Sequence, residues 1–106
     1  MSALADRHCT ALPAGTPALG RQQIDVLIAQ LPGWTLENGT IVKTWSFANY
    51  YETLAFVNAV AWVSHREDHH PELAVSYNRC RVQYSTHSVG GLSENDFICA
   101  AKLEAL

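Results

Sequence analysis

The sequence predicts an α+β fold with the element order α-β-β-α-β-β-α, in which a four-stranded antiparallel sheet carries three helices packed on one face. Two stretches with the pattern of a β-hairpin, 34–47 and 71–87, are separated by one long helical stretch, 48–67. A shorter helical stretch lies at each end of this series, over 19–31 and 93–106. Two hairpins separated by a helix are typical of one antiparallel sheet that the helices cover.

The length of 106 residues fits a single domain, which we expect over residues 19–106. Residues 1–18 show no apolar period and contain several turn-forming residues. We therefore expect a flexible N-terminal arm there. The turn-forming residues are Pro13, Gly15, Thr16 and Pro17.

The first helix and hairpin each end in a recognisable signal. Residues 19–31 carry apolar side chains three to five positions apart, which predicts an amphipathic helix. Pro32 and Gly33 end it, because a proline just past the last turn cannot continue a helix. Asn38-Gly39 then divides two alternating stretches, and this pair is typical of a type I′ hairpin turn, in which both residues need positive φ.

Residues 48–67 form the longest helical candidate, with Asn49 as N-cap and Glu52 placed for a capping box. Two apolar stripes run along this helix, which is more than one sheet face can cover. We therefore expect a subunit interface on the helix, giving a homodimer or a homotetramer. One stripe holds Tyr50, Leu54, Val57 and Ala61, and the other holds Phe56, Val60 and Val63.

The second hairpin is expected to pair residues 71–77 with residues 80–87, and His87 would end its second strand. Apolar and polar residues alternate along 80–87, which predicts a sheet with one buried face. Ser93 is placed to cap the last helix, with Asp96 at the third helical position. The expected inward-facing residues of the second strand are Cys80, Val82 and Tyr84.

Composition excludes several classes of protein. Hydrophobic residues make up 48% of the chain and charged residues 16%, which is too apolar for a disordered chain. Seven Lys and Arg and a net charge of −3 leave no basic patch for phosphates, so we expect no nucleic-acid partner. The longest uncharged, mostly apolar stretch, 53–64, is shorter than the roughly 20 residues of a membrane-spanning helix, so we expect no membrane contact.

The first residues lack a basic region followed by an apolar run, which predicts no secretory signal and a cytoplasmic location. Cys9, Cys80 and Cys99 show no paired spacing. They predict free thiols in a reducing compartment.

Four of the five histidines, His65, His69, His70 and His87, stand close to the expected ends of elements. Histidine exchanges protons near neutral pH, because its unperturbed pKa is about 6.5. Such a group predicts either acid–base chemistry or metal binding. A histidine at a helix C-terminus can also have a purely structural role, in which it interacts with the helix dipole, and this alternative stays open for His65.

The metal hypothesis rests on the spacing of His65 and His69, which would place two ligands one helical turn apart. The chain has neither an HExxH motif nor paired cysteines. We therefore expect no metal, and keep a metal-dependent hydrolase only as a third hypothesis.

The spacing His65-x3-His69-His70-Pro71-x5-Tyr77-x9-His87-x8-Asp96 resembles the signature of the pterin-4a-carbinolamine dehydratases. The resemblance extends from about Leu19 to Leu103. It implies the α-β-β-α-β-β-α fold and a homo-oligomer. It also implies an enzyme that uses neither a metal nor an organic cofactor. Further matching blocks are Gly33-Trp34, Asp68-His69-His70-Pro71, Tyr77-Asn78, Ser85-Thr86-His87 and Gly91-Leu92-Ser93.

The activity that the resemblance implies is that of a hydro-lyase. It would dehydrate 4a-hydroxytetrahydropterin to quinonoid dihydropterin and water, and so recycle tetrahydrobiopterin for aromatic amino acid hydroxylation. The reaction removes a proton from N5 and gives one to the departing hydroxyl. Groups with a pKa near the working pH do both well.

The resemblance also implies roles for individual residues. The catalytic residues would be His69, His70 and His87. Many family members have an acid at the position of His65, so the partner of the first catalytic histidine is open, with Glu67 as one candidate. Asp96 would orient a histidine or cap the last helix. The substrate-binding residues would be Asp68, Pro71, Ser85, Thr86, Ser88 and Trp34.

A binding module is the alternative hypothesis. Some animal members of this family are dimerisation cofactors for a homeodomain transcription factor, acting through the long helix. The apolar helix over 48–67 could serve a partner in the same way.

Overall fold

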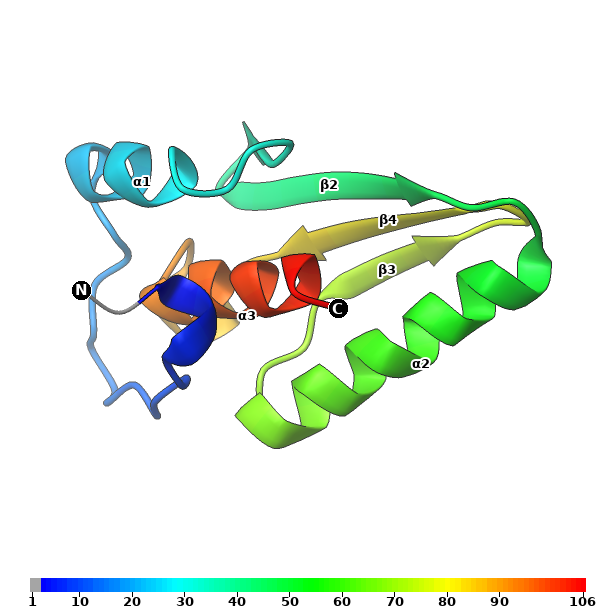
Figure 1. The fold of residues 1–106 in the computed structure, drawn as a ribbon. Coiled ribbons are helices and arrows are strands. Elements are labelled where there is room, and N and C mark those ends of the chain that lie inside the picture. The colour runs from blue at the N-terminus through cyan, green and yellow to red at the C-terminus, as the bar shows by residue number, and fades with distance from the viewer. Residues whose placement is uncertain (1–2) are drawn as a thin grey trace.

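The four strands form one antiparallel sheet, as the two hairpin patterns predict, and the structure shows that their order is β1-β2-β4-β3. The computed structural model describes residues 3–106. Because β2 pairs with β4, the second strands of the two hairpins meet at the centre of the sheet (Figure 1). The strands are β1 (Thr35–Glu37), β2 (Thr40–Ser46), β3 (Glu72–Val75) and β4 (Arg79–Tyr84).

Three α-helices contribute to one hydrophobic core, on the sheet face that carries Ile41, Val82 and Tyr84. The α+β class and the element order are therefore confirmed. None of the helices described over residues 3–106 is long and apolar enough to span a membrane. The helices are α1 (Arg21–Ile28), α2 (Tyr50–Glu67) and α3 (Glu94–Glu104), and two short 3-10 helices are η1 (Leu4–Asp6) and η2 (His87–Val89).

The first hairpin turns at Asn38 and Gly39, whose φ angles are 50° and 75°. Both are positive, as the type I′ prediction requires. The helix before it is shorter than expected, since α1 ends at Ile28. Leu31, beyond that end, is nevertheless buried in the core and anchors the connection to β1.

Successive side chains of β2 and β4 point to opposite faces of the sheet. The residues on the helix side include Ile41, which lies opposite Tyr84. The other face carries polar side chains, among them Arg81 and Gln83. Gln83 also lies opposite Glu72 of β3, so these two side chains share the polar face.

Helix α2 begins as predicted, because the Asn49 side chain accepts a hydrogen bond from the Glu52 amide. Both predicted stripes contribute to the core: Val60 and Val63 are buried in it, and Phe56 and Val57 are partly buried against it. On the remaining surface of the helix, Trp62 is 62% exposed. In Figure 1, α2 runs away from the sheet at an angle and leaves much of its length uncovered within the single chain.

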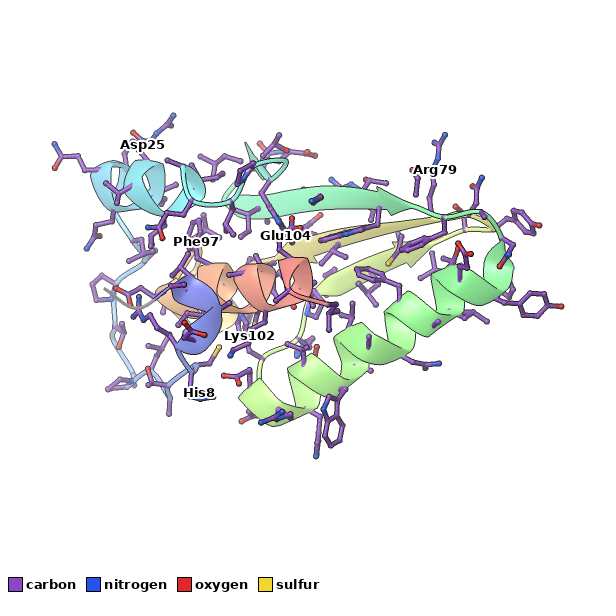
Figure 2. All side chains as sticks on the ribbon, viewed as in Figure 1. His8, Asp25, Arg79, Phe97, Lys102 and Glu104 are labelled. Carbon is purple, nitrogen blue, oxygen red and sulfur yellow. The ribbon has the colours of Figure 1, made fainter. Side chains whose placement is uncertain are left out.

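The N-terminal segment is packed, which differs from the expectation of a flexible arm over residues 1–18. Residues 1 and 2 lie outside the described part of the chain. Leu4 is 6% exposed and is part of the core. The sequence did not predict this, because one buried residue in a short helix leaves no periodic apolar pattern. The Cys9 amide donates to Glu67 Oε1 (2.7 Å), and Lys102 Nζ donates to the Ala5 carbonyl (2.9 Å). These bonds join the segment to α2 and α3, and Figure 2 shows Lys102 close to the end of α2.

The second hairpin is shorter than predicted at both strands. β4 ends at Tyr84, and His87 lies in η2 rather than at the end of a strand. After β4 the chain forms a tight turn outside the sheet. Thr86 pairs with Gly91 in a single bridge across this turn, and Gly90 within it has a φ of 70°. His87 is therefore held by a compact turn beside the sheet.

Candidate active site

The chain reverses sharply at the end of α2, and this reversal positions the first two histidines. Asp68 adopts the left-handed conformation with a φ of 51°, and both its amide and the His69 amide donate to the Ser64 carbonyl. Asp68 therefore ends the helix. Because His69 lies beyond that end, it does not share a helix face with His65.

A cavity of about 350 Å³ lies between this reversal, the ends of β3 and β4, and η2. It brings together all three predicted catalytic histidines, His69, His70 and His87. Four of the predicted binding residues also line it, and so do two residues that the sequence did not single out. The former are Asp68, Ser85, Thr86 and Ser88, and the latter are Glu72 and Gln83.

Asp96 is fully buried and contacts His69 from behind the cavity. Its Oδ1 lies 2.6 Å from His69 Nε2, and its Oδ2 accepts from Thr86 Oγ1 (2.8 Å) and from the Ser93 amide (3.0 Å). An ionised carboxylate only accepts hydrogen bonds, so His69 Nε2 carries the hydrogen of this pair. Nδ1 of the same ring is then the atom available to exchange a proton. Asp96 therefore both orients a histidine and caps α3.

Tyr84 supports the same histidine from the sheet. The two rings stack with centroids 5.8 Å apart and an interplanar angle of 10°. Among the described residues, the buried Tyr84 hydroxyl has no hydrogen-bond partner. Burial, together with the nearby Cys99, Cys9 and Asp96, raises the pKa of Tyr84 well above its ordinary value, so the phenol stays neutral. The sequence identified this residue only as part of the core.

Two residues on the polar face of the sheet line the cavity opposite each other in register, Glu72 on β3 and Gln83 on β4. Arg81 Nη1 donates to Gln83 Oε1 (2.7 Å), and Arg81 Nη2 donates to Glu37 Oε1 (3.0 Å). In the sequence, the alternation along β4 indicated only a solvated face here. Alternation distinguishes a buried face from a solvated one, but it does not show that a cavity lies over the solvated face.

Besides Asp96, three predicted site residues lie outside the cavity lining. Trp34 is buried, donates from Nε1 to Glu104 Oε1 (3.0 Å) and packs edge-on against Trp45. His65 is exposed, with its ring 5.9 Å from that of Trp62. Pro71 is half-buried and is not part of the lining.

Glu67, a candidate partner for the first histidine, is engaged elsewhere. Its carboxylate accepts from the Cys9 amide, lies 3.1 Å from His8 Nδ1 and lies 3.8 Å from Lys102 Nζ. The acid that pairs with His69 is Asp96, 27 residues further along the chain. Although position 65 holds a histidine and not an acid, His69 therefore still has a carboxylate partner, which is Asp96.

Within residues 3–106, no group of three or more His, Cys, Asp or Glu side chains has a geometry that could hold a metal ion. Two thiols do meet, since Cys9 Sγ lies 3.5 Å from Cys99 Sγ. The hydrogen bond with Cys9 and burial both raise the pKa of Cys99 above its ordinary value. All three cysteines are free thiols, as predicted.

Comparison with known proteins gives a consistent result. Residues 17–106 match the family model described as pterin 4 alpha carbinolamine dehydratase. A protein of Nitrosomonas eutropha is 59% identical over 104 residues, which cover 97% of this chain and 92% of the relative. A protein of Dechloromonas aromatica is 59% identical over 103 residues, covering 97% and 92%. Both relatives carry the provisional name pterin-4-alpha-carbinolamine dehydratase.

Two solved structures are similar to the fold. One is described as a transcriptional coactivator/pterin dehydratase from Brucella melitensis, with a TM-score of 0.79 and 29% identity over 83% of this chain and 96% of that chain. The other is a pterin dehydratase-like protein described as a RuBisCO assembly factor in the alpha-carboxysome. It has a TM-score of 0.56 and 22% identity over 68% and 83% of the two chains. The second likeness shows the fold alone.

Proposed function

This chain belongs to the pterin-4-alpha-carbinolamine dehydratase family, and we propose that His69, His70 and His87 perform the dehydration by general acid–base catalysis. The observation that carries the proposal is the single cavity that all three histidines line. The enzyme is a hydro-lyase, and its substrate would be a 4a-hydroxytetrahydropterin.

The reaction needs one proton removed and one proton supplied. The C4a–O bond breaks and the hydroxyl leaves as water after protonation, while N5 loses its proton to form quinonoid dihydropterin. Imidazoles suit both steps because their unperturbed pKa is about 6.5. Positioned groups of this kind are typically worth roughly 10² to 10⁴-fold in rate.

His69 is the most firmly oriented of the three. Asp96 holds its Nε2, and Tyr84 fixes the plane of the ring. A carboxylate in this position also stabilises the imidazole when it gains a proton, because opposite charges then lie 2.6 Å apart. His69 is thus built to accept a proton at Nδ1 without losing its orientation.

Polar groups on the cavity wall would hold the substrate. Ser85 and Ser88 present hydroxyls that can donate or accept, and Asp68 presents a carboxylate. Thr86 also lines the cavity, but its hydroxyl is bound to Asp96 and lies 2.7 Å from Ser93 Oγ. Thr86 therefore links the substrate wall to the residue that orients His69.

The cellular role follows from the chemistry of the product. Quinonoid dihydropterin is the form from which tetrahydrobiopterin is regenerated, so the enzyme would serve aromatic amino acid hydroxylation. We propose the cytoplasm as its location, because free thiols such as Cys9, Cys80 and Cys99 are typical of a reducing compartment. We further propose that α2 makes the chain a homodimer or homotetramer, because its outer surface exposes the large side chains of Tyr51 and Trp62 in the single chain.

A second function deserves a test for one specific reason. The Brucella melitensis protein, 29% identical, is described as a coactivator as well as a dehydratase. The uncovered surface of α2 could bind another protein in place of a second copy. A pull-down with purified chain that recovers only self-association would argue against this alternative.

The direct test is a stopped-flow assay of 4a-hydroxytetrahydropterin decay, with the substrate generated in situ. We expect the purified protein to accelerate the decay by at least about 10²-fold over the uncatalysed reaction. A decay rate equal to that of buffer alone would refute the proposed activity.

A further inference from the structure

The wall of the cavity away from the histidines carries a matched donor and acceptor. Glu72 on β3 and Gln83 on β4 are directly opposite each other in the antiparallel register, and both line the cavity. Side chains opposite each other on one sheet face have Cβ atoms about 4.5–5.5 Å apart. The two head groups can therefore contact neighbouring atoms of one planar ligand.

The orientation of the Gln83 amide is determined by its neighbour. Arg81 Nη1 donates to Gln83 Oε1 at 2.7 Å, so the oxygen is the atom that faces Arg81. Arg81 is itself held by Glu37 at 3.0 Å. The Gln83 amide nitrogen, with its two hydrogens, is then the part left to interact in the cavity. Glu72, in contrast, presents a carboxylate that only accepts.

This pair fits one edge of a pterin ring. The pyrimidine edge offers two adjacent donors, the 2-amino group and N3–H, followed by one acceptor, the 4-oxo oxygen. We propose that Glu72 accepts from the 2-amino group and N3–H, and that the Gln83 amide nitrogen donates to the 4-oxo oxygen. The proposal rests on the function proposed above and names the residues that select the substrate.

The same placement agrees with the position of the chemistry. In the pterin ring the 4-oxo group stands next to C4a and on the same side as N5. A ring held by that edge at Glu72 and Gln83 therefore extends its reacting atoms toward the rest of the cavity, which His69, His70 and His87 line. Recognition and catalysis would use different walls of one cavity.

Two nearly isosteric substitutions test each contact separately. Glu72→Gln keeps the size of the side chain and removes its negative charge and one acceptor. Gln83→Glu keeps the oxygen that faces Arg81 and replaces the donor nitrogen by an acceptor. Glu52→Gln is the matched control, because Glu52 lies at the other end of α2, where its carboxylate accepts from the Ala48 amide.

The measurement is calorimetric binding of 7,8-dihydropterin and of 7,8-dihydrolumazine, which has an oxygen in place of the 2-amino group. Wild type should prefer the pterin by about 10-fold or more, because a site built to bind a donor rejects an analogue that lacks it. Glu72→Gln should weaken pterin binding about 10-fold and reduce this preference toward one, since bonds to charged groups contribute most. Gln83→Glu should weaken both ligands alike, since both carry the 4-oxo group, and Glu52→Gln should change neither.

Wild type that binds both ligands equally, or variants that bind them like wild type, would overturn the proposal. Either result is compatible with full dehydratase activity, so it would leave the proposed function intact. A wild type without dehydratase activity would instead remove the proposed function, whatever the binding data show.

Discussion

Asp96 connects parts of the site that lie far apart in the sequence. One oxygen contacts His69, and the other binds Thr86 and the start of α3. The sequence placed Asp96 correctly at the third position of the helix, because capping depends on neighbours a few residues away. Its contact with a histidine 27 residues away depends on the tertiary fold, and no local pattern could reveal it.

Replacement of Asp96 by asparagine should separate its two roles. We expect Asp96→Asn to lower kcat by at least about 10-fold, a share of the roughly 10² to 10⁴-fold that positioned acid–base groups supply. KM should change little, because Asp96 does not line the cavity. The control is Ser93→Ala, which disturbs the same helix start without touching His69. Equal losses of kcat in both variants would show that Asp96 acts only on the helix.

The Tyr84 side chain should be needed for its ring and not for its hydroxyl. Among the described residues the hydroxyl has no hydrogen-bond partner, and it is buried. A buried polar group without a partner costs about 1–3 kcal/mol, so Tyr84→Phe should leave the free energy of unfolding unchanged or raise it. Urea denaturation measures this. A loss above about 1 kcal/mol would mean that the hydroxyl has a stabilising partner.

At the scale of elements, hairpins and helix starts could be predicted because each has a local cause. Asn38-Gly39 adopts the two positive φ angles that its turn requires, and Asn49 caps α2. The end of α2 at Glu67 agrees with the predicted range 48–67, but the sharp reversal that follows it could not be predicted. Pro71 indicated that a helix ends nearby, but the reversal at Asp68 depends on hydrogen bonds to the Ser64 carbonyl.

The N-terminal segment was the element that the sequence described least well. Its attachment depends on Glu67, whose side chain is 5% exposed and accepts from the Cys9 amide. Burial by itself would raise the pKa of Glu67. The hydrogen bonds from Cys9 and His8, with the charge of Lys102, outweigh burial and lower the pKa from the ordinary 4.5.

A lowered carboxyl pKa gives stability that is present above the unfolded-state value and is lost as the pH falls through the folded-state value. We therefore expect Glu67→Gln to cost about 1–2 kcal/mol of unfolding free energy at pH 7. The difference from wild type should shrink below pH 4.5, the ordinary value for this carboxyl. The matched control is Glu94→Gln, which breaks the exposed pair with Arg7 and should cost little. If Glu67→Gln lowers the unfolding free energy by the same amount down to pH 3, the charge of Glu67 does not contribute to holding the N-terminal segment.

At the scale of the whole molecule, the long helix α2 leaves large aromatic side chains uncovered. The chain measures 41 × 28 × 24 Å, and the outer surface of α2 exposes Tyr51 (82%) and Trp62 (62%). The low charged fraction of 16% agrees with a surface meant for another copy. The sequence predicted more apolar surface on this helix than the core can cover, but both predicted stripes have members against the core, and the exposed Tyr51 and Trp62 belong to neither stripe.

The oligomer can be tested by light scattering. We expect a dimer or tetramer for wild type, and a shift toward the monomer for the double variant Tyr51→Glu with Trp62→Glu. Val26→Glu is the control, because Val26 is an equally exposed apolar residue (65%) on α1. Wild type at the monomer mass would refute the α2 interface.

The sequence predicted most residues that line the cavity, the three histidines and four of the expected binding residues, but not the two on the sheet. The spacing of the histidines resembles a family signature, so His69, His70 and His87 could be named before any geometry was known. Glu72 and Gln83 could not, because their alternation on the strands is that of any solvated sheet face. Trp34 was placed at the site by resemblance, but in this chain its ring is buried in the core.

The measurement closest to the central claim compares the four clustered histidines in one assay of 4a-hydroxytetrahydropterin decay. Three of them line the cavity, while His65 is exposed outside it and serves as the internal control. We expect His69→Ala, His70→Ala and His87→Ala each to reduce kcat/KM by about 10²-fold or more, and His65→Ala to retain nearly full activity. Three cavity variants as active as wild type, or a His65→Ala variant as impaired as they are, would contradict the account.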